Sequence, residues 1–171
     1  KALEKHPHGI DLGPLETCFP ERLATQGKVI NLVPNLFMKD ITRLQKLLEK
    51  PAKQGPETFL LIGRRDVRSN NSWMHNSQRL VKGKNRCTAL IHPDDAQRLA
   101  INDGDPVVIS SRVGEIEIPA EITDRMMPGV ISVPHGWGHS RSGSQLGVAA
   151  QHAGVSLNDV TDERCVDAIT G

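Results

Sequence analysis

Basic and amide side chains gather between residues 63 and 86, and they are the first candidates for binding a ligand. This segment holds seven lysines and arginines and one acidic residue, Asp66, although the whole chain has a net charge of +1. Arginine presents a planar fork of N–H donors that matches phosphate oxygens, and the nearby asparagines offer the donors and acceptors that the edge of a heterocycle requires. The segment therefore predicts a site for an anionic ligand. A solvated basic loop on the surface is the alternative.

A second candidate is the sequence Val133-Pro134-His135-Gly136-Trp137-Gly138-His139, which follows an apolar stretch typical of a buried strand. Glycines on both sides of an aromatic residue let backbone amides come close to a flat or anionic ligand. The alternative is that Trp137 only covers the hydrophobic core. His135 and His139 are four residues apart, but the glycines disfavour a helix and no third ligand is near in the sequence, so we do not expect a zinc site.

A third, polar stretch lies at residues 155–162 and contains Asn158. Short polar side chains of this kind cap helices and form turns. By itself the stretch predicts only a turn or the start of a helix.

The hydrophobic pattern predicts the elements that position these residues. Residues 1–35 are rich in Pro and Gly and show no sustained period, which indicates an extended arm. Apolar residues at spacings of three and four predict an amphipathic helix at about residues 36–50. Residues 50–56 then have the composition of a linker. We therefore expect a first domain over residues 1–56 and a second over residues 57–171.

Short strands separated by tight turns dominate the second domain. Residues 115–122 alternate between polar and apolar types, so we expect them to form a hairpin with residues 106–112. Short helices are expected from Pro93 onward and around residues 147–153. The pattern is typical of a mainly β fold, that is, a β-rich α+β barrel or sandwich. The expected strands are residues 59–62, 88–91, 106–112, 115–122 and 130–134, with residues 166–169 as a further candidate.

Composition narrows the class of protein. A length of 171 residues is enough for one domain with an appendage. The nearly neutral charge gives no general attraction to nucleic acid or membrane, and no apolar run approaches the roughly 20 residues of a membrane span. Three cysteines lie far apart without a Cys-x-x-Cys pair. They predict no disulfide framework, zinc site or iron–sulfur cluster, and they favour a cytoplasmic location, with the periplasm as the alternative.

In their order along the chain, these stretches resemble the C-terminal molybdopterin dinucleotide-binding domain of the dimethyl sulfoxide reductase family of molybdenum and tungsten enzymes. The resemblance covers about residues 57–171. It includes the arginine- and asparagine-rich loop that ends in Ser72-Trp73, the run from His92 to Ile109, the aromatic turn after Pro134, and the segment from Leu157 to Thr161. No single motif is specific to the family, but their succession is.

The resemblance implies a six-stranded double-psi β-barrel with short helices that binds molybdopterin guanine dinucleotide. In this family the pterin dithiolenes hold the metal, so we expect no redox centre and no catalysis from the domain alone. The expected partners are the remaining domains of a parent oxidoreductase similar to formate dehydrogenase or nitrate reductase. Two features depart from the family: the turn after Pro134 has smaller residues, and the usual last strand would follow Gly171. The implied cofactor contacts are Arg64, Arg65, Arg68, Asn71, Ser72 and Trp73 in the first loop, His135, Gly136, Trp137 and Gly138 in the second, and Asn158.

Two other functions compete with cofactor binding. A β-barrel could bind nucleic acid through residues 64–86, but such barrels use aromatic platforms, and this chain has no Tyr, three Phe and two Trp. A protein-interaction module of the same barrel type would need an exposed apolar groove. Under the cofactor-binding hypothesis, residues 64–76 and 135–139 should lie together at one end of the barrel, because both follow strands that we expect to be neighbours.

Overall fold

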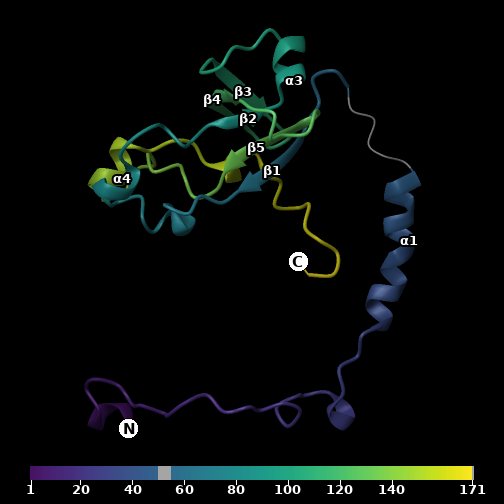
Figure 1. The fold of residues 1–171 in the computed structure, drawn as a ribbon, viewed down its shortest axis with the longest axis vertical. Coiled ribbons are helices and arrows are strands. Elements are labelled where there is room, and N and C mark those ends of the chain that lie inside the picture. The colour runs from purple at the N-terminus through teal and green to yellow at the C-terminus, as the bar shows by residue number, and fades with distance from the viewer. Residues whose placement is uncertain (50–54, 171) are drawn as a thin grey trace. The chain divides into compact units, whose positions relative to one another are not determined.

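The computed structural model describes residues 1–49 and 55–170, and the chain divides into two units after Glu49 (Figure 1). The sequence predicts a linker at residues 50–56, and most of that linker lies outside the described residues.

The first unit consists of an arm and one helix. The arm contains two short 3-10 helices, η1 (Leu3–Lys5) and η2 (Gln26–Lys28). The helix α1 (Asn35–Glu49) forms where the apolar spacing predicts it, and Arg43 pairs with Asp40 one turn earlier at 2.7 Å. No residue of this unit is buried, because the apolar side chains of the arm and of α1 have no packed partner within the unit.

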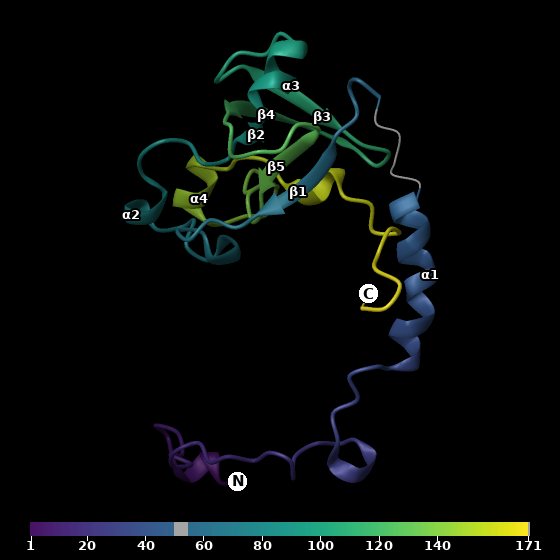
Figure 2. The same cartoon turned by 45° about the vertical axis from the view of Figure 1, so that its right-hand side comes forward.

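The second unit is built on a mixed five-stranded sheet with the strand order β1-β5-β2-β4-β3 (Figures 1 and 2). Its strands are β1 (Leu60–Arg64), β2 (Ala89–Ile91), β3 (Pro106–Ser110), β4 (Glu115–Ile122) and β5 (Val130–Pro134). Together with a few short helices, this sheet confirms a β-rich α+β fold.

Two parallel pairs determine where the loops leave the sheet. β1 runs parallel to β5, so that Arg64 lies opposite Pro134, and β2 runs parallel to β4. β3 and β4 form the antiparallel hairpin that the alternating pattern predicts. Because β1 and β5 are parallel neighbours, the segments that follow them begin at the same edge of the sheet.

The candidate strand at residues 166–169 is wrong, since these residues form a coil and a turn. The Asp167 carboxylate accepts hydrogen bonds from the backbone N–H groups of Ile169 and Thr170. This local bonding gives the backbone an alternative to pairing in a sheet.

The hydrophobic core lies on the inward face of the sheet. β4 shows the clearest alternation, with Ile116, Ile118 and Ala120 buried and Glu115 and Glu117 exposed. Side chains from the loops and from the 3-10 helix η4 (Leu157–Val160) complete the core. Its buried members are Cys87, Ala89, Ile91, Ala96, Ile116, Ile118, Ala120, Ile131, Val133, Trp137, Leu157 and Val160.

Short helices lie between the strands and after the last one, and the two that the sequence predicts are present. α3 (Pro93–Arg98) begins at His92, whose Nδ1 accepts the N–H of Asp94, and α4 (Gly147–Gln151) lies in the expected segment. The helices η3 (Asn70–Ser72) and α2 (Gln78–Val81) lie between β1 and β2. Among the described helices, none combines the length and the apolar character needed to cross a bilayer.

Candidate functional site

The loop after β1 (residues 65–76, the first loop) and the loop after β5 (residues 135–139, the second loop) meet at one edge of the sheet. The backbone N–H of His135 donates to the carbonyl of Arg64 at 2.9 Å, which extends the pairing of β1 with β5 into the loops. The prediction that the two loops are neighbours is therefore confirmed, and the parallel pairing of their strands is the reason.

Gly136 lets the backbones of the two loops approach each other. Its φ of +93° lies in the left-handed region, and a Cβ at this position would stand 2.7 Å from the carbonyl carbon and oxygen of Asn71. A real Cβ does not come that close to backbone, so only glycine fits here without a shift. The second loop thus forms a cradle against the turn at Asn71.

Three consecutive residues of the first loop, Asn70, Asn71 and Ser72, have positive φ angles of 40°, 63° and 115°. Residues other than glycine rarely adopt such angles, and each costs on the order of 1–3 kcal/mol unless the surroundings hold it. Strained backbone of this kind is concentrated at ligand-binding sites. The strain points to the first loop as a functional segment.

The structure separates the adjacent residues Arg64 and Arg65. The Arg64 guanidinium points inward against the sheet, where it donates to the carbonyls of Ser132 at 2.5 Å and Thr88 at 2.7 Å and to the Thr88 hydroxyl at 3.0 Å. Burial lowers the pKa of Arg64, while the nearby Glu121 carboxylate opposes that shift. Arg64 therefore stabilises the sheet, and this placement argues against a direct contact with a ligand.

Arg65 points outward from the first loop. Its guanidinium donates to the Asn71 side-chain oxygen, and Arg68 is also exposed. Trp73 is 85% exposed, which is unusual for so large an apolar side chain. An open hollow of about 660 Å³, lined in part by Arg65, Asn71 and Met74, lies in this loop. The first loop therefore presents guanidinium, amide and aromatic groups on one segment.

Trp137 belongs to the core, which the sequence left as an alternative to ligand contact. It is 8% exposed and packs against His75 of the first loop, with ring centroids 4.1 Å apart. His75 in turn lies with its Nδ1 2.7 Å from Nε2 of His139. Sequence reasoning missed His75 and its pairing with His139, because the two histidines are 64 residues apart and no local spacing connects them.

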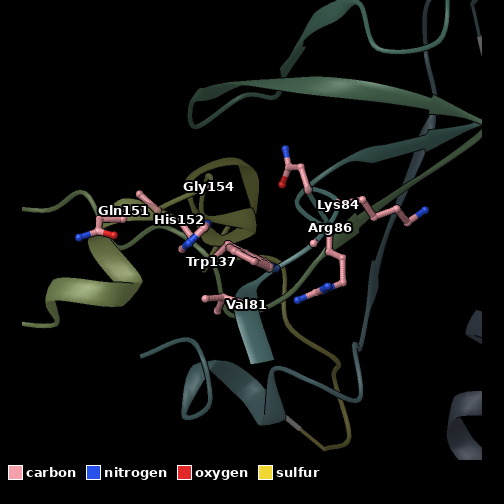
Figure 3. A pocket seen from close by; sticks show the side chains of 10 residues that line it. Val81, Lys84, Arg86, Trp137, Gln151, His152 and Gly154 are labelled. Carbon is pink, nitrogen blue, oxygen red and sulfur yellow. The ribbon is translucent and has the colours of Figure 1, made fainter. Parts of the chain in front are cut away.

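A smaller hollow of about 290 Å³ is lined in part by Trp137 (Figure 3). Figure 3 shows the Trp137 ring between Val81, Arg86 and His152. The guanidinium of Arg86 bonds to the carbonyl of Leu80 and lies 3.8 Å from Asp66, so its charge is already partnered. The lining residues are Val81, Gly83, Lys84, Asn85, Arg86, Trp137, Gln151, His152, Ala153 and Gly154.

The third polar stretch also reaches the second loop. The backbone N–H groups of Gly138 and His139 both donate to the carbonyl of Ala153, and a Cβ on Gly138 would stand 2.8 Å from that of Ser156. Asn158 follows on η4 and is exposed. The turn that contains Asn158 therefore borders the second loop. Within the described residues, no group of three or more His, Cys, Asp and Glu side chains is placed to hold a metal ion.

Comparison with known proteins identifies the family. A family model described as "Molydopterin dinucleotide binding domain" matches residues 59–171. The chain belongs to this family. It is a molybdopterin dinucleotide-binding domain, and the cofactor that it binds is of that class.

The curated relatives are much longer proteins. ArrA, the molybdopterin-containing chain of the arsenate respiratory reductase of Chrysiogenes arsenatis, is 32% identical over 114 residues, which are 63% of this chain and 13% of ArrA. Dimethyl sulfoxide reductase DmsA of Escherichia coli (strain K12) is 42% identical over 57 residues, 33% of this chain and 7% of DmsA. A tetrathionate reductase chain of Salmonella typhimurium is 32% identical over 79 residues, 41% of this chain and 8% of the reductase chain. The domain therefore spans 13% or less of each of these proteins.

A solved structure supports the fold alone. Acetylene hydratase from Pelobacter acetylenicus superposes with a TM-score of 0.50 at 20% sequence identity, over 71% of this chain and 16% of the hydratase.

The site of this molybdopterin dinucleotide-binding domain suits a molybdopterin dinucleotide. Exposed guanidinium groups match the pyrophosphate, and the Asn71 amide matches a heterocycle edge. The glycine cradle at Gly136 brings backbone close to a flat group. The buried atoms Nε2 of His75 and Nε1 of Trp137 have no hydrogen-bond partner in the described structure. Buried polar atoms without a partner are rare in protein interiors, and these two belong to the two loops, where a polar ligand or a water molecule would satisfy them.

Proposed function

We propose that this chain is the cofactor-clamping domain of a larger molybdopterin-dependent oxidoreductase and that its two loops grip molybdopterin guanine dinucleotide. The observation that carries the proposal is the meeting of the strained first loop with Gly136 of the second, next to outward-facing arginines. The names of the relatives, reductases of arsenate, dimethyl sulfoxide and tetrathionate, support a redox role for the parent protein. The bound cofactor would supply the dithiolene sulfurs and the metal at which electrons are exchanged.

We assign separate roles to the side chains of this chain. Arg65 and Arg68 would pair with pyrophosphate oxygens, Asn71, Ser72 and Trp73 would contact the flat part of the cofactor, and Asn158 would donate from η4. His135, Gly136 and Gly138 would contribute backbone, while Trp137 supports the loops from the core. Arg64 would act only through the sheet, because its donors are bonded to the backbone carbonyls of Ser132 and Thr88.

The double variant R65A/R68A of the full-length enzyme tests this proposal. The measured quantities are the amounts of molybdenum and guanine nucleotide per mole of protein. Each charge-assisted hydrogen bond contributes on the order of 1.5–3 kcal/mol, so loss of both should weaken cofactor binding by at least about a hundredfold. R79A/K82A is the matched control, because it removes two exposed charges from the same basic segment. Full molybdenum loading of R65A/R68A, or equal loss in the control, would contradict the assigned roles.

We also propose that the domain comprises residues 57–171 and that residues 1–56 form a separate arm, helix and linker. The match of the family model to residues 59–171 supports this division, and so does the separation of the chain after Glu49. The remaining domains of the parent protein would be its partners.

Within this domain we infer that the five strands belong to a six-stranded double-psi barrel. β1 and β3 end the strand order, so each has one edge without a partner among the described strands. An apolar hollow of about 550 Å³ lies between them, lined by Phe59 and Leu61 on one side and Val107 and Ile109 on the other. A further strand would fit there and pair with both edges. In the full-length enzyme, the β3 amides should then exchange with deuterium as slowly as those of β4; fast exchange at β3 would count against the barrel.

A further inference from the structure

His75 and His139 join the two loops through their side chains. Nδ1 of His75 lies 2.7 Å from Nε2 of His139, and the two rings meet edge to face with centroids 4.9 Å apart. On its other side, His75 packs on Trp137. Since His75 is only 1% exposed, its ring is enclosed by these neighbours.

Both histidines are closely connected to the segments that would bind the cofactor. The backbone N–H of His75 donates to the carbonyl of Ser72, the last of the three residues with positive φ. His139 follows Gly136 by three residues, and the N–H of His139 is held by Ala153. A bond between the two rings therefore links the strained turn to the glycine cradle.

The bond between two imidazole rings limits how many protons they can carry. One nitrogen must donate an N–H and the other must accept with a lone pair. A neutral pair satisfies this condition, and so does a pair with one added proton. With two added protons both facing nitrogens carry hydrogen, and at 2.7 Å they repel each other.

The charges around His75 favour the state with few protons. Burial and the adjacent His139 lower the pKa of His75 to about 4, and Arg86 acts in the same direction, while Asp66 and the Gly136 backbone oppose them. Burial also lowers the pKa of His139, against the Gly136 backbone. Asp66 and Arg86 face each other at 3.8 Å, so their effects on His75 partly cancel. At neutral pH the pair is therefore neutral and the bond is intact.

We propose that His75 and His139 are positioning residues for the cofactor site, and that their hydrogen bond clamps the first loop to the second as long as the pair carries no more than one added proton. This inference rests on the proposed function, because the clamp affects the cofactor only if both loops contact it. Neither histidine needs to touch the cofactor.

Substitutions at position 75 can separate the hydrogen bond from the ring packing. H75N keeps a polar atom close to the position of Nδ1, whereas H75F keeps a ring against Trp137 but has no nitrogen. In the full-length enzyme, H75F should lose molybdenum and guanine nucleotide about tenfold faster than the wild type during dialysis at about pH 7.5, which corresponds to about 1.4 kcal/mol. H75N should stay within about twofold of the wild type. H139Q, which retains a polar atom near Nε2, is the corresponding conservative variant on the second loop.

The pH profile tests the clamp in a way that general destabilisation does not reproduce. Cofactor loss from the wild type should accelerate as the pH falls through about 4, because His75 then takes up a proton and a doubly protonated pair cannot keep the bond. H75N should show a flatter profile, since an amide does not titrate in this range. The proposal would be overturned if cofactor loss from the wild type and from H75N depended on pH in the same way. It would also be overturned if H75F kept its cofactor as well as the wild type does.

A measurement without cofactor distinguishes failure of the clamp from failure of the proposed function. In the 171-residue chain labelled with 15N-histidine, the spectra should show coupling across the bond and a His75 that remains neutral at about pH 6. Free titration of both rings near pH 6.5 would exclude the clamp whatever the cofactor does. If the bond is seen and R65A/R68A loses cofactor while H75F does not, the proposed function stands and only the positioning role is overturned.

Discussion

Two neighbouring arginines, Arg64 and Arg65, show how far apart the roles of adjacent residues can be. Successive side chains of a strand point to opposite faces, so the end of β1 directs one guanidinium inward and the next outward. Inside, the backbone carbonyls of Ser132 and Thr88 receive the Arg64 donors. Outside, Arg65 shares a hydrogen bond with Asn71 and keeps further donors available for an anion.

R64M and R65M should therefore differ in stability. R64M removes the partner of buried carbonyls and should lower the free energy of unfolding by about 1–3 kcal/mol. R65M replaces an exposed side chain and should change it by less than about 0.5 kcal/mol. Chemical denaturation of the two variants measures the difference, and equal losses would show that Arg64 has no special structural role.

Gly136 provides a second test at the level of single residues. G136A should prevent the close approach of the two loops, because the new Cβ would overlap the Asn71 backbone. G104A is the matched control: Gly104 also has a positive φ, of +88°, but no other group lies within 4 Å of the place that a Cβ would take.

Both alanine variants share the cost of a left-handed residue, about 1–2 kcal/mol. We expect the free energy of unfolding to fall by at least about 1 kcal/mol more in G136A than in G104A. We also expect G136A to bind less cofactor. Equal stability of the two variants would mean that the loops can separate at no cost.

At the level of elements, the turn before β5 is held by a short helix. Asp95 of α3 is buried, and its carboxylate accepts the N–H of Gly129 at 2.6 Å and a hydrogen bond from Arg98 at 2.7 Å. Burial raises the pKa of Asp95, but the hydrogen bonds from Arg98 and Gly129 outweigh it, so the net shift is downward. The helix thereby fixes the start of the strand that carries the second loop.

D95N should destabilise the second unit by about 1–3 kcal/mol at pH 7, whereas D94N, an exposed change in the same first helical turn, should have little effect. The folded-state pKa of Asp95 is depressed, so its contribution is present above the unfolded pKa of about 3.9 and disappears as the pH falls through the folded value. The difference in the free energy of unfolding between the wild type and D95N should thus become smaller below about pH 4. Thermal unfolding from about pH 3 to about pH 7 tests this, and a constant difference would rule out the charged form of Asp95 as the cause.

At the level of the whole molecule, the two units differ in how much of their chain is buried. Residues 1–49 contain no buried residue, while the second unit contains the whole hydrophobic core of the described chain. Segments without buried contacts open at little cost in free energy, and proteases cut them first.

Limited trypsin digestion should therefore cleave at Arg22 or Lys28 of the arm before Arg112 in the β3–β4 turn. Arg112 is a suitable control site for cleavage, because its side chain is also exposed. It is paired with Asp162. Mass spectrometry of the first fragments gives the order of cleavage. Cleavage at Arg112 ahead of the arm would contradict the division of the chain into a loose arm and a folded domain.

Local patterns in the sequence were enough to predict much of this protein. The apolar spacing in α1 and the alternation in β4 each depend on residues close in sequence, and both elements form where the pattern indicates. The two loops and the family could be recognised for the same reason, since their motifs are continuous stretches of chain. The failed strand at residues 166–169 is the exception, because hydrogen bonds to Asp167 outweighed an apolar pattern of four residues.

Only the tertiary structure decided which side chains of those loops face a ligand. The inward direction of Arg64 depends on carbonyls of Ser132 and Thr88, and the place of Trp137 in the core depends on His75. The partner of His75 is 64 residues away, and the two meet because β1 and β5 run parallel in this register. Hydrophobic period and turn chemistry act over a few residues, whereas the direction of a side chain is determined by whichever distant groups the sheet brings to it.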